Sequence, residues 1–197
     1  MLYLASSSPR RAELLRQIGV KFEIIEASID ESAEPGESAR ELVNRLCREK
    51  ALKGRQQLHA MQPGDLVLAA DTLIHLHGQL IGKPESEGHC RAILEQLSGQ
   101  THQVLSAVAL VDASGQLHEK CTSNEITFRH LQDDEIHRYC ASDEPHDKAG
   151  AYAIQGRAAI FIEHLSGSYS SVMGLPLFET AQLLRQAGYD LTTYDEQ

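Results

Sequence analysis

The first eleven residues constrain the fold of this chain most strongly, because a short strand there leads directly into a helix. Leu2, Tyr3 and Leu4 are typical of a buried strand, and three serines follow them. Pro9 suits the first helical position, where its fixed φ helps and its missing N–H costs nothing. Apolar residues then recur at helical spacing, at Leu14, Leu15 and Ile18. The stretch therefore predicts a strand, a serine-rich turn and a helix.

Two arginines, Arg10 and Arg11, occupy the first turn of this predicted helix. The helix dipole favours negative side chains at that end, so paired arginines conflict with it. A bound anion removes the conflict, because backbone N–H groups, hydroxyls such as that of Ser6 and two guanidinium groups all favour phosphate. The alternative is that both arginines are solvated. Neither Gly-x-x-x-x-Gly-Lys-Ser/Thr nor Gly-x-Gly-x-x-Gly, the commonest nucleotide signatures, occurs in the chain.

Length and charge limit the classes of protein to which the chain can belong. Its 197 residues fit one domain, or one domain with two lobes. Eighteen basic against 28 acidic residues give a net charge of −10. An acidic protein is a poor candidate for binding nucleic acid without sequence preference or an anionic membrane. We therefore expect any positive charge that handles phosphate to be concentrated locally.

The four cysteines and the apolar runs indicate a cytoplasmic protein. Wide spacing and the absence of any Cys-x-x-Cys pair predict free, buried thiols in a reducing compartment rather than a disulfide scaffold. The N-terminus lacks the pattern of a signal peptide, and no apolar run approaches the length that spans a membrane.

An acidic loop is expected between residues 28 and 37, where Pro35-Gly36 interrupts the chain. Asp30, Glu31 and Glu34 lie in it. Three carboxylates near a phosphate site could hold a divalent cation, because Mg²⁺ prefers oxygen ligands and often shares them with substrate phosphates. A solvated acidic loop is the simpler interpretation, and the residues alone favour it.

Ser38 and Glu41 form a capping-box pattern that predicts the start of a long helix. The apolar stripe of this helix runs through Leu42, Val43, Leu46 and Cys47, and Lys50 continues it. A lysine on the inward face is unfavourable unless an anion accompanies it or its stem reaches the surface. The more specific alternative is that Lys50 lines a cleft and reaches a phosphate.

An apolar strand from Leu66 to Ala70 runs into Asp71 and Thr72. An acid at the end of a buried strand is a natural general base or metal ligand, although capping of local N–H groups is common too. Apolar residues continue at Leu73, Ile74 and Leu76, and after a hairpin Gly82-Lys83 offers close backbone approach and another cation.

Further elements follow along the rest of the chain. We expect helices at 86–97, 132–140 and from 175 onward, with Leu177, Ala181 and Leu184 aligned on the last one, strands at 21–27, 103–111, 117–128 and 157–163, polar loops at 142–155 and 166–174, and a polar tail at 189–197.

Several of these stretches together resemble the Maf family of nucleoside triphosphate pyrophosphatases. The match extends from Leu2 to about Gly188 and rests on several motifs in the right order. These are LASSSPRR at 4–11, REKA at 48–51, AADT at 69–72, GKP at 82–84, SGQTH at 98–102, SDEPHDKAGAYAIQG at 142–156 and GSYSSVMGLP at 167–176.

The resemblance also implies a branch of the family and roles for individual residues. Arg10 directly after Pro9, Thr72 after Asp71, and Gln155 are similar to the dTTP/UTP branch. In that branch Asp71 would be the catalytic base. Phosphate and metal contacts fall on Arg10, Arg11, Glu31, Lys50 and Lys83, with Glu31 and Asp71 holding Mg²⁺ or Mn²⁺, and base specificity falls on Arg10, Thr72 and Gln155.

The family's fold and activity are the remaining expectations. The resemblance implies an α/β protein with a mixed, strongly twisted sheet, flanking helices and two lobes around a central cleft, over a single domain at 1–188, often as a homodimer. It implies hydrolysis of dTTP and UTP to the monophosphate and pyrophosphate. The alternative is a nucleotide-binding regulator of cell division with little or no turnover.

Overall fold

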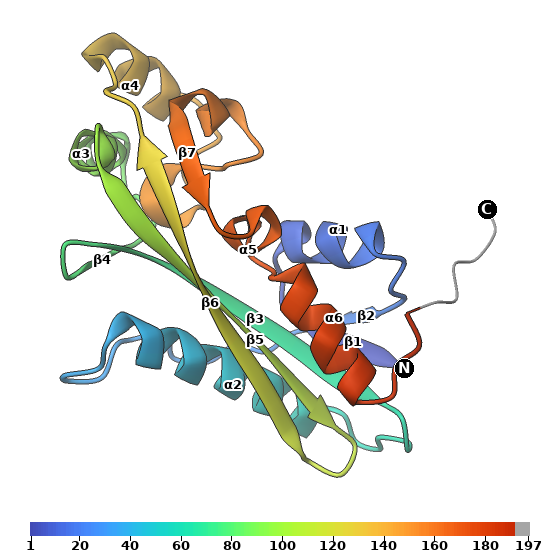
Figure 1. Cartoon of the computed structure of the whole chain (residues 1–197). Helices are drawn as coiled ribbons and strands as arrows, with labels where there is room; N and C mark the ends of the chain where they lie inside the picture. Colours follow the sequence, from blue (N-terminus) through green and yellow to red (C-terminus); the bar gives the residue numbers. More distant parts are fainter. Residues whose placement is uncertain (192–197) are drawn as a thin grey trace. The chain divides into compact units, whose positions relative to one another are not determined.

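The structure is a computed structural model that describes residues 1–191 (Figure 1). Its strands are β1 (Leu2–Ala5), β2 (Glu23–Ile25), β3 (Leu66–Leu76), β4 (Gln79–Ile81), β5 (Thr101–Asp112), β6 (Leu117–Phe128) and β7 (Ile162–Ser166). Its helices are α1 (Pro9–Gln17), α2 (Ala39–Gln57), α3 (Glu87–Leu97), α4 (Asp133–Cys140), α5 (Tyr169–Met173) and α6 (Leu177–Gln186), with 3-10 turns η1 (Ala149–Ala151) and η2 (Arg157–Phe161).

Within the described residues the strands form one mixed sheet, with neighbours in the order β2-β1-β3-β5-β6-β7 and with β4 paired to β3. β1 runs parallel to β2 and β3, whereas the β3–β4 and β6–β7 pairs are antiparallel. The predicted class, a mixed α/β fold with helices flanking a sheet, is confirmed.

The chain divides into two compact units. Unit 1 comprises residues 1–71, 106–122 and the segment from 174 onward, and unit 2 comprises residues 72–105 and 123–173. The predicted polar tail begins in unit 1, where the N–H of Tyr189 donates to the carbonyl of Leu184 at 2.9 Å. Residues 192–197 of that tail lie outside the described residues.

Helix α2 lies very close to the strands of unit 1. A Cβ built on Gly54 would lie 2.9 Å from Cβ of Ala5, 3.0 Å from Cδ1 of Ile25 and 3.1 Å from Cγ1 of Val67. These three neighbours belong to β1, β2 and β3, so the helix passes over the parallel part of the sheet. The predicted capping box starts α2, because Ser38 Oγ accepts from the N–H of Glu41 while the Glu41 carboxylate accepts from the N–H of Ser38.

The core of unit 2 joins α3, α4 and the inward faces of several strands. Its aromatic centre is Phe128, whose ring meets Tyr152 edge-on at 4.9 Å and His102 at 5.2 Å between centroids. Fully buried Leu94 and Leu97 of α3 belong to the same apolar cluster.

The prediction of four free thiols is wrong for two of them. Cys90 of α3 and Cys140 of α4 form a disulfide, with their Cα atoms 5.8 Å apart. Fifty residues separate them in the sequence, and only the packing of α3 on α4 brings them together. Cys47 and Cys121 are free.

Three predicted elements differ from the structure. The stretch predicted as a strand at 157–163 is mostly the η2 turn, and β7 begins only at Ile162. The strand predicted at 21–27 is limited to Glu23–Ile25, with Ile24 exposed, and the loop predicted at 166–174 contains α5. In α6 the buried residues are Thr180, Leu183 and Leu184, because the helix turns this face rather than Leu177 and Ala181 inward. No helix within residues 1–191 has the length and apolar character needed to cross a bilayer.

Candidate active site

The start of α1 holds the paired arginines as the sequence predicts. Pro9 is the first helical residue, and the first turn contains no acid. Ser6, which is buried, accepts from the backbone N–H of Ser8 at 3.2 Å and from Nη1 of Arg11 at 3.1 Å. Nε of Arg11 donates to the carbonyl of Gly174 at 3.0 Å. The second arginine, Arg10, is half-buried in the same turn.

Asp71 lies in the middle of β3, not at the end of a strand as predicted. The strand continues through Leu76 because residues 74–76 pair with β4. Asp71 is only 7 % exposed, and Nη2 of Arg11 lies 3.8 Å from its Oδ1. A buried carboxylate requires compensating positive charge or hydrogen bonds.

Lys50 supplies that compensation from α2. Its Nζ donates to Oδ1 of Asp71 at 2.7 Å and also forms an ion pair of 2.6 Å with Oε1 of Glu31. Lys50 therefore has an anionic partner, which is one of the two alternatives that the sequence left open for a lysine on the inward face of this helix. Glu31 is paired rather than fully solvated, although its side chain is 61 % exposed. Within unit 1 the polar contacts run from Glu31 through Lys50, Asp71 and Arg11 to Ser6.

Burial changes the acid–base properties of two neighbours of Asp71. Burial lowers the pKa of Arg11, and the charge of Asp71 opposes that change. Burial raises the pKa of the Cys47 thiol, and Asp71 raises it further. Sγ of Cys47 donates to the carbonyl of Ala69 at 3.4 Å, so this cysteine is a neutral packing residue rather than a nucleophile.

Glu31 and Asp71 are the carboxylates to which the resemblance assigns a divalent metal. Their oxygens converge on one cationic group, the ammonium of Lys50. Across residues 1–191 no group of three or more His, Cys, Asp or Glu is arranged to hold a metal. Mg²⁺ is commonly held by one or two carboxylates together with substrate phosphates. The two carboxylates therefore fit a metal that arrives with a phosphorylated ligand.

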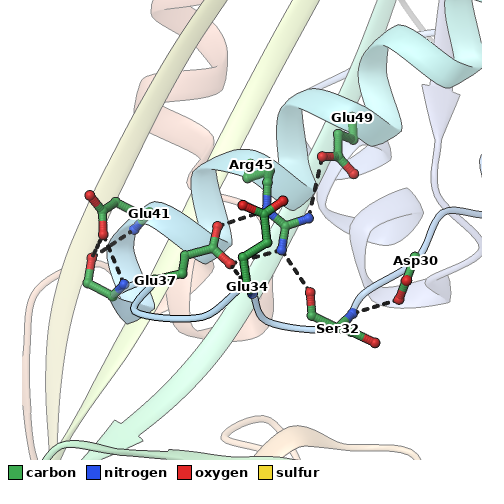
Figure 2. Close-up of polar contacts among 8 residues, drawn as sticks. Asp30, Ser32, Glu34, Glu37, Glu41, Arg45 and Glu49 are labelled. Carbon is green, nitrogen blue, oxygen red and sulfur yellow. Dashed lines mark hydrogen bonds and ion pairs between the residues drawn. The ribbon is translucent and has the colours of Figure 1, made fainter.

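The acidic loop before α2 is held by one arginine, as Figure 2 shows. Arg45 donates from Nε and Nη2 to the two carboxylate oxygens of Glu37, at 2.8 and 2.9 Å, and from Nη2 to the carbonyl of Ser32 at 2.8 Å. Arg45, and after it the N–H of Glu34, lowers the pKa of Glu37 to about 2. Sequence reasoning missed Arg45, since no helical spacing rule relates it to Glu37, eight residues earlier in the preceding loop.

Unit 2 contains the other three predicted residues. Thr72 is half-buried in β3, whereas Lys83 and Gln155 are exposed. The segments that carry these residues are linked through Gly150, whose N–H donates to the carbonyl of Gly82 at 2.9 Å. Gly150 has a φ of +72°, and a Cβ there would lie 2.5 Å from Cδ1 of Ile74 on β3. Only a glycine fits both constraints easily.

The polar loop predicted at 142–155 is held by a carboxylate and a histidine that sequence reasoning missed. Glu144 accepts from the hydroxyl of Tyr139 at 3.0 Å and from the N–H of Arg157 at 2.9 Å. His102 shares a hydrogen bond of 2.8 Å with the hydroxyl of Tyr152, and burial lowers the pKa of His102 to about 4. His102 is in phase with Val104 and Ser106 on β5, and this alternation could have identified it as inward-facing.

The fold and the unit 1 cluster define a class: a mixed α/β protein in which two largely buried cations and two carboxylates lie beside a helix N-terminus suited to a phosphorylated ligand. The chain belongs to the Maf-like protein family, whose model matches residues 1–187. This confirms the resemblance that the motifs indicated.

Curated relatives share about half of their residues with this chain. A dTTP/UTP pyrophosphatase of Aromatoleum aromaticum is 53% identical, over 96% of this chain and 97% of the relative. A dTTP/UTP pyrophosphatase of Escherichia coli is 51% identical, over 93% and 91%. Among solved structures, a dITP/XTP pyrophosphatase of Mycobacterium abscessus aligns with a TM-score of 0.44 and 16% identity, over 95% of each chain. Similarity at that level supports no argument about the site.

Proposed function

We propose that this protein hydrolyses dTTP and UTP to the nucleoside monophosphate and pyrophosphate. The relatives that share about half of its residues carry that name, and they align over nearly their whole length. The observation that carries the proposal for this chain is the buried Asp71, bonded to Lys50 and close to Arg11. A carboxylate that can accept a proton from water, beside two cations that offset phosphate charge, suits an attack by water on a phosphate.

In the proposed reaction Asp71 accepts a proton from a water molecule whose oxygen bonds to the α-phosphorus. The bond between that phosphorus and the oxygen bridging to the β-phosphate breaks, and pyrophosphate leaves with the bond's electron pair. Arg10, Arg11, Lys50 and Lys83 would offset the charge on the phosphates. Preorganised charges of this kind commonly supply the largest part of catalysis.

A divalent cation, Mg²⁺ or Mn²⁺, is part of the proposal. Glu31 and Asp71 would hold it, and when bound it would supply charge neutralisation at the phosphates. Lys50 bridges the same two carboxylates now, so its ammonium group would move toward the phosphates when nucleotide and metal enter.

Base recognition is proposed from the family resemblance. Thr72 and Gln155 would contact the pyrimidine, with Arg10 as the third specificity residue. The amide of Gln155 offers both a donor and an acceptor, which matches the carbonyl and N3–H edge of uracil and thymine. Gln155 is exposed, so its side chain is accessible to a ligand.

Partners and location complete the proposal. A net charge of −10 disfavours nucleic acid as a partner, and salt-dependent DNA binding would argue against the proposal. The family resemblance favours a homodimer, which light scattering after gel filtration would detect. A cytoplasmic location follows from the nucleotide substrates, and cell fractionation would check it.

The test is a turnover screen of the common nucleoside triphosphates with Mg²⁺ or Mn²⁺, in which pyrophosphate and phosphate are measured separately. Pyrophosphate from dTTP and UTP, in preference to purine nucleotides, supports the proposal. Release of single phosphate would move the attack to another phosphorus and refute the mechanism. Nucleotide binding without turnover would favour the regulator of cell division instead.

A further inference from the structure

The segment that carries Glu31 contains several negative charges close together in the sequence. Five carboxylates lie between residues 30 and 41, namely Asp30, Glu31, Glu34, Glu37 and Glu41. Like charges this close in sequence repel one another and favour an open loop. Glu31 nevertheless reaches Lys50 at 2.6 Å, although most of its side chain is exposed to water. Something other than burial of Glu31 must therefore hold the loop in place.

Arg45 is the group that joins the two ends of this loop, as Figure 2 shows. Its Nη2 donates to the carbonyl of Ser32, the residue that directly follows Glu31. Its Nε and Nη2 hold both oxygens of Glu37, which in turn accepts from the N–H of Glu34 at 3.0 Å. The Arg45 side chain is only 18 % exposed and that of Glu37 only 9 %. The loop is thus folded around one largely buried ion pair.

We propose that Arg45 is a positioning residue for Glu31: through Ser32 and Glu37 it fixes the acidic loop, so that the Glu31 carboxylate is placed at Lys50 before ligands bind. The inference rests on the proposed function, in which Glu31 helps to hold the metal. Arg45 itself contacts neither Lys50 nor Asp71 among the contacts of the described residues. Its effect is therefore exerted through the backbone of the loop.

The chemistry of this position requires arginine rather than lysine. One guanidinium group reaches two carboxylate oxygens and a carbonyl in fixed directions, whereas an ammonium group is a single point charge. Arg45 also projects from α2, five residues before Lys50 on the same helix. A side chain on a regular helix is positioned more precisely than a side chain on a loop.

The experiment compares Arg45→Ala with Arg48→Ala, a matched control. Arg48 lies one turn further along α2 and forms a two-point pair of the same geometry with Glu119, at 2.9 and 2.7 Å, but this pair is more exposed and does not hold the acidic loop. Mn²⁺ binding is measured by electron paramagnetic resonance with α,β-imido-dUTP, a nucleotide whose α–β bridge resists hydrolysis. Amide hydrogen exchange of residues 30–37 is measured on the same proteins without ligand.

Arg45→Ala is expected to weaken Mn²⁺ binding about 10- to 100-fold, the usual effect of losing a group that orients a metal ligand. Exchange in residues 30–37 should quicken, and kcat at saturating Mn²⁺ should stay close to that of the unaltered protein. Arg48→Ala should change none of these. Arg45→Lys should recover only part of the affinity. Combining Arg45→Ala with Glu31→Gln should add little to the loss caused by Glu31→Gln alone, because both changes remove the same ligand.

Two results would overturn the inference: unchanged exchange and Mn²⁺ affinity in Arg45→Ala, or equal losses in Arg45→Ala and Arg48→Ala. If Arg45→Ala does not fold, Glu37→Gln replaces it, because it removes the charge of the partner and leaves Arg45 in place. Failure of the proposed function has a different signature. The unaltered protein would then bind no Mn²⁺–nucleotide complex, and the exchange rates would still decide whether Arg45 holds the loop.

Discussion

The ammonium group of Lys50 donates a hydrogen bond of 2.7 Å to the carboxylate of Asp71, and both side chains are about nine-tenths buried. The two residues are 21 positions apart in the sequence and come from α2 and β3. Their partners differ, because Lys50 also contacts Glu31 at 2.6 Å whereas the second cation near Asp71, Arg11, is 3.8 Å away. Removing one member should therefore not have the same effect as removing the other.

Lys50→Met should destabilise the protein more than Asp71→Asn. The methionine leaves the buried Asp71 with Arg11, at 3.8 Å, as its remaining cation, and loss of one member of a buried pair typically costs about 3–5 kcal/mol. Asparagine keeps a hydrogen-bond acceptor at position 71, and Lys50 keeps Glu31. Urea denaturation of the two variants measures the difference. A larger loss of unfolding free energy in Asp71→Asn would show that Lys50 is not the main support of Asp71.

Gly54→Ala should destabilise the protein although alanine is the better helix former by about 1 kcal/mol. A Cβ at this position meets Cβ of Ala5 at 2.9 Å, and that atom is fixed to the backbone of β1. Overpacking of this kind costs about 1–3 kcal/mol and should outweigh the helix gain. Gly88→Ala in α3 is the control, because its nearest neighbour lies 3.9 Å away and the residue is exposed. It should be neutral or slightly stabilising, and thermal denaturation would separate the two.

His102 should make the protein less stable as the pH falls from 6.5 toward 4. Its folded-state pKa is lowered by burial to about 4, so between these values the unfolded chain binds a proton that the folded chain does not. Stability then falls with decreasing pH by up to about 1.4 kcal/mol per pH unit. His102→Gln keeps a partner for Tyr152 without a titrating ring. Its unfolding free energy should show a smaller dependence on pH in this range, and an identical dependence would contradict the assignment.

The Cys90–Cys140 disulfide predicts how many cysteines react with a thiol reagent before and after reduction. Iodoacetamide added to unfolded, unreduced protein should label two of the four cysteines, Cys47 and Cys121, and reductant should expose all four. Closing a loop of 50 residues stabilises a fold by about 4 kcal/mol in the chain-entropy model. Reduced protein should therefore unfold at a lower temperature. Four labelled cysteines before reduction would refute the pairing.

Local signals in the sequence predicted most of the elements that carry the unit 1 cluster. Pro9 marks the start of α1, the Ser38–Glu41 capping box marks the start of α2, and the apolar run before Asp71 marks β3, because each is a short-range pattern with a physical cause. Lys50 stood out for a similar reason, since a cation on an apolar stripe requires an anion.

Long-range partners could not be predicted in the same way. Cys90 and Cys140 look like ordinary buried thiols until α3 packs on α4, and Arg45 looks like a surface residue until the acidic loop folds onto α2. The end of β3 was also misplaced, because a charged residue suggested the end of a strand that in fact continues to pair with β4. The branch of the family and the roles of Thr72, Lys83 and Gln155 came from resemblance to known motifs, and these roles stay predictions.

The most direct test of the central claim is dTTP hydrolysis in water enriched in heavy oxygen, with the protein and its Asp71→Asn variant. Attack at the α-phosphorus predicts label in thymidine monophosphate and none in pyrophosphate. Loss of the general base predicts a rate lower by about a hundredfold or more in the variant. Label in pyrophosphate or in released phosphate, or full activity of Asp71→Asn, would contradict the account.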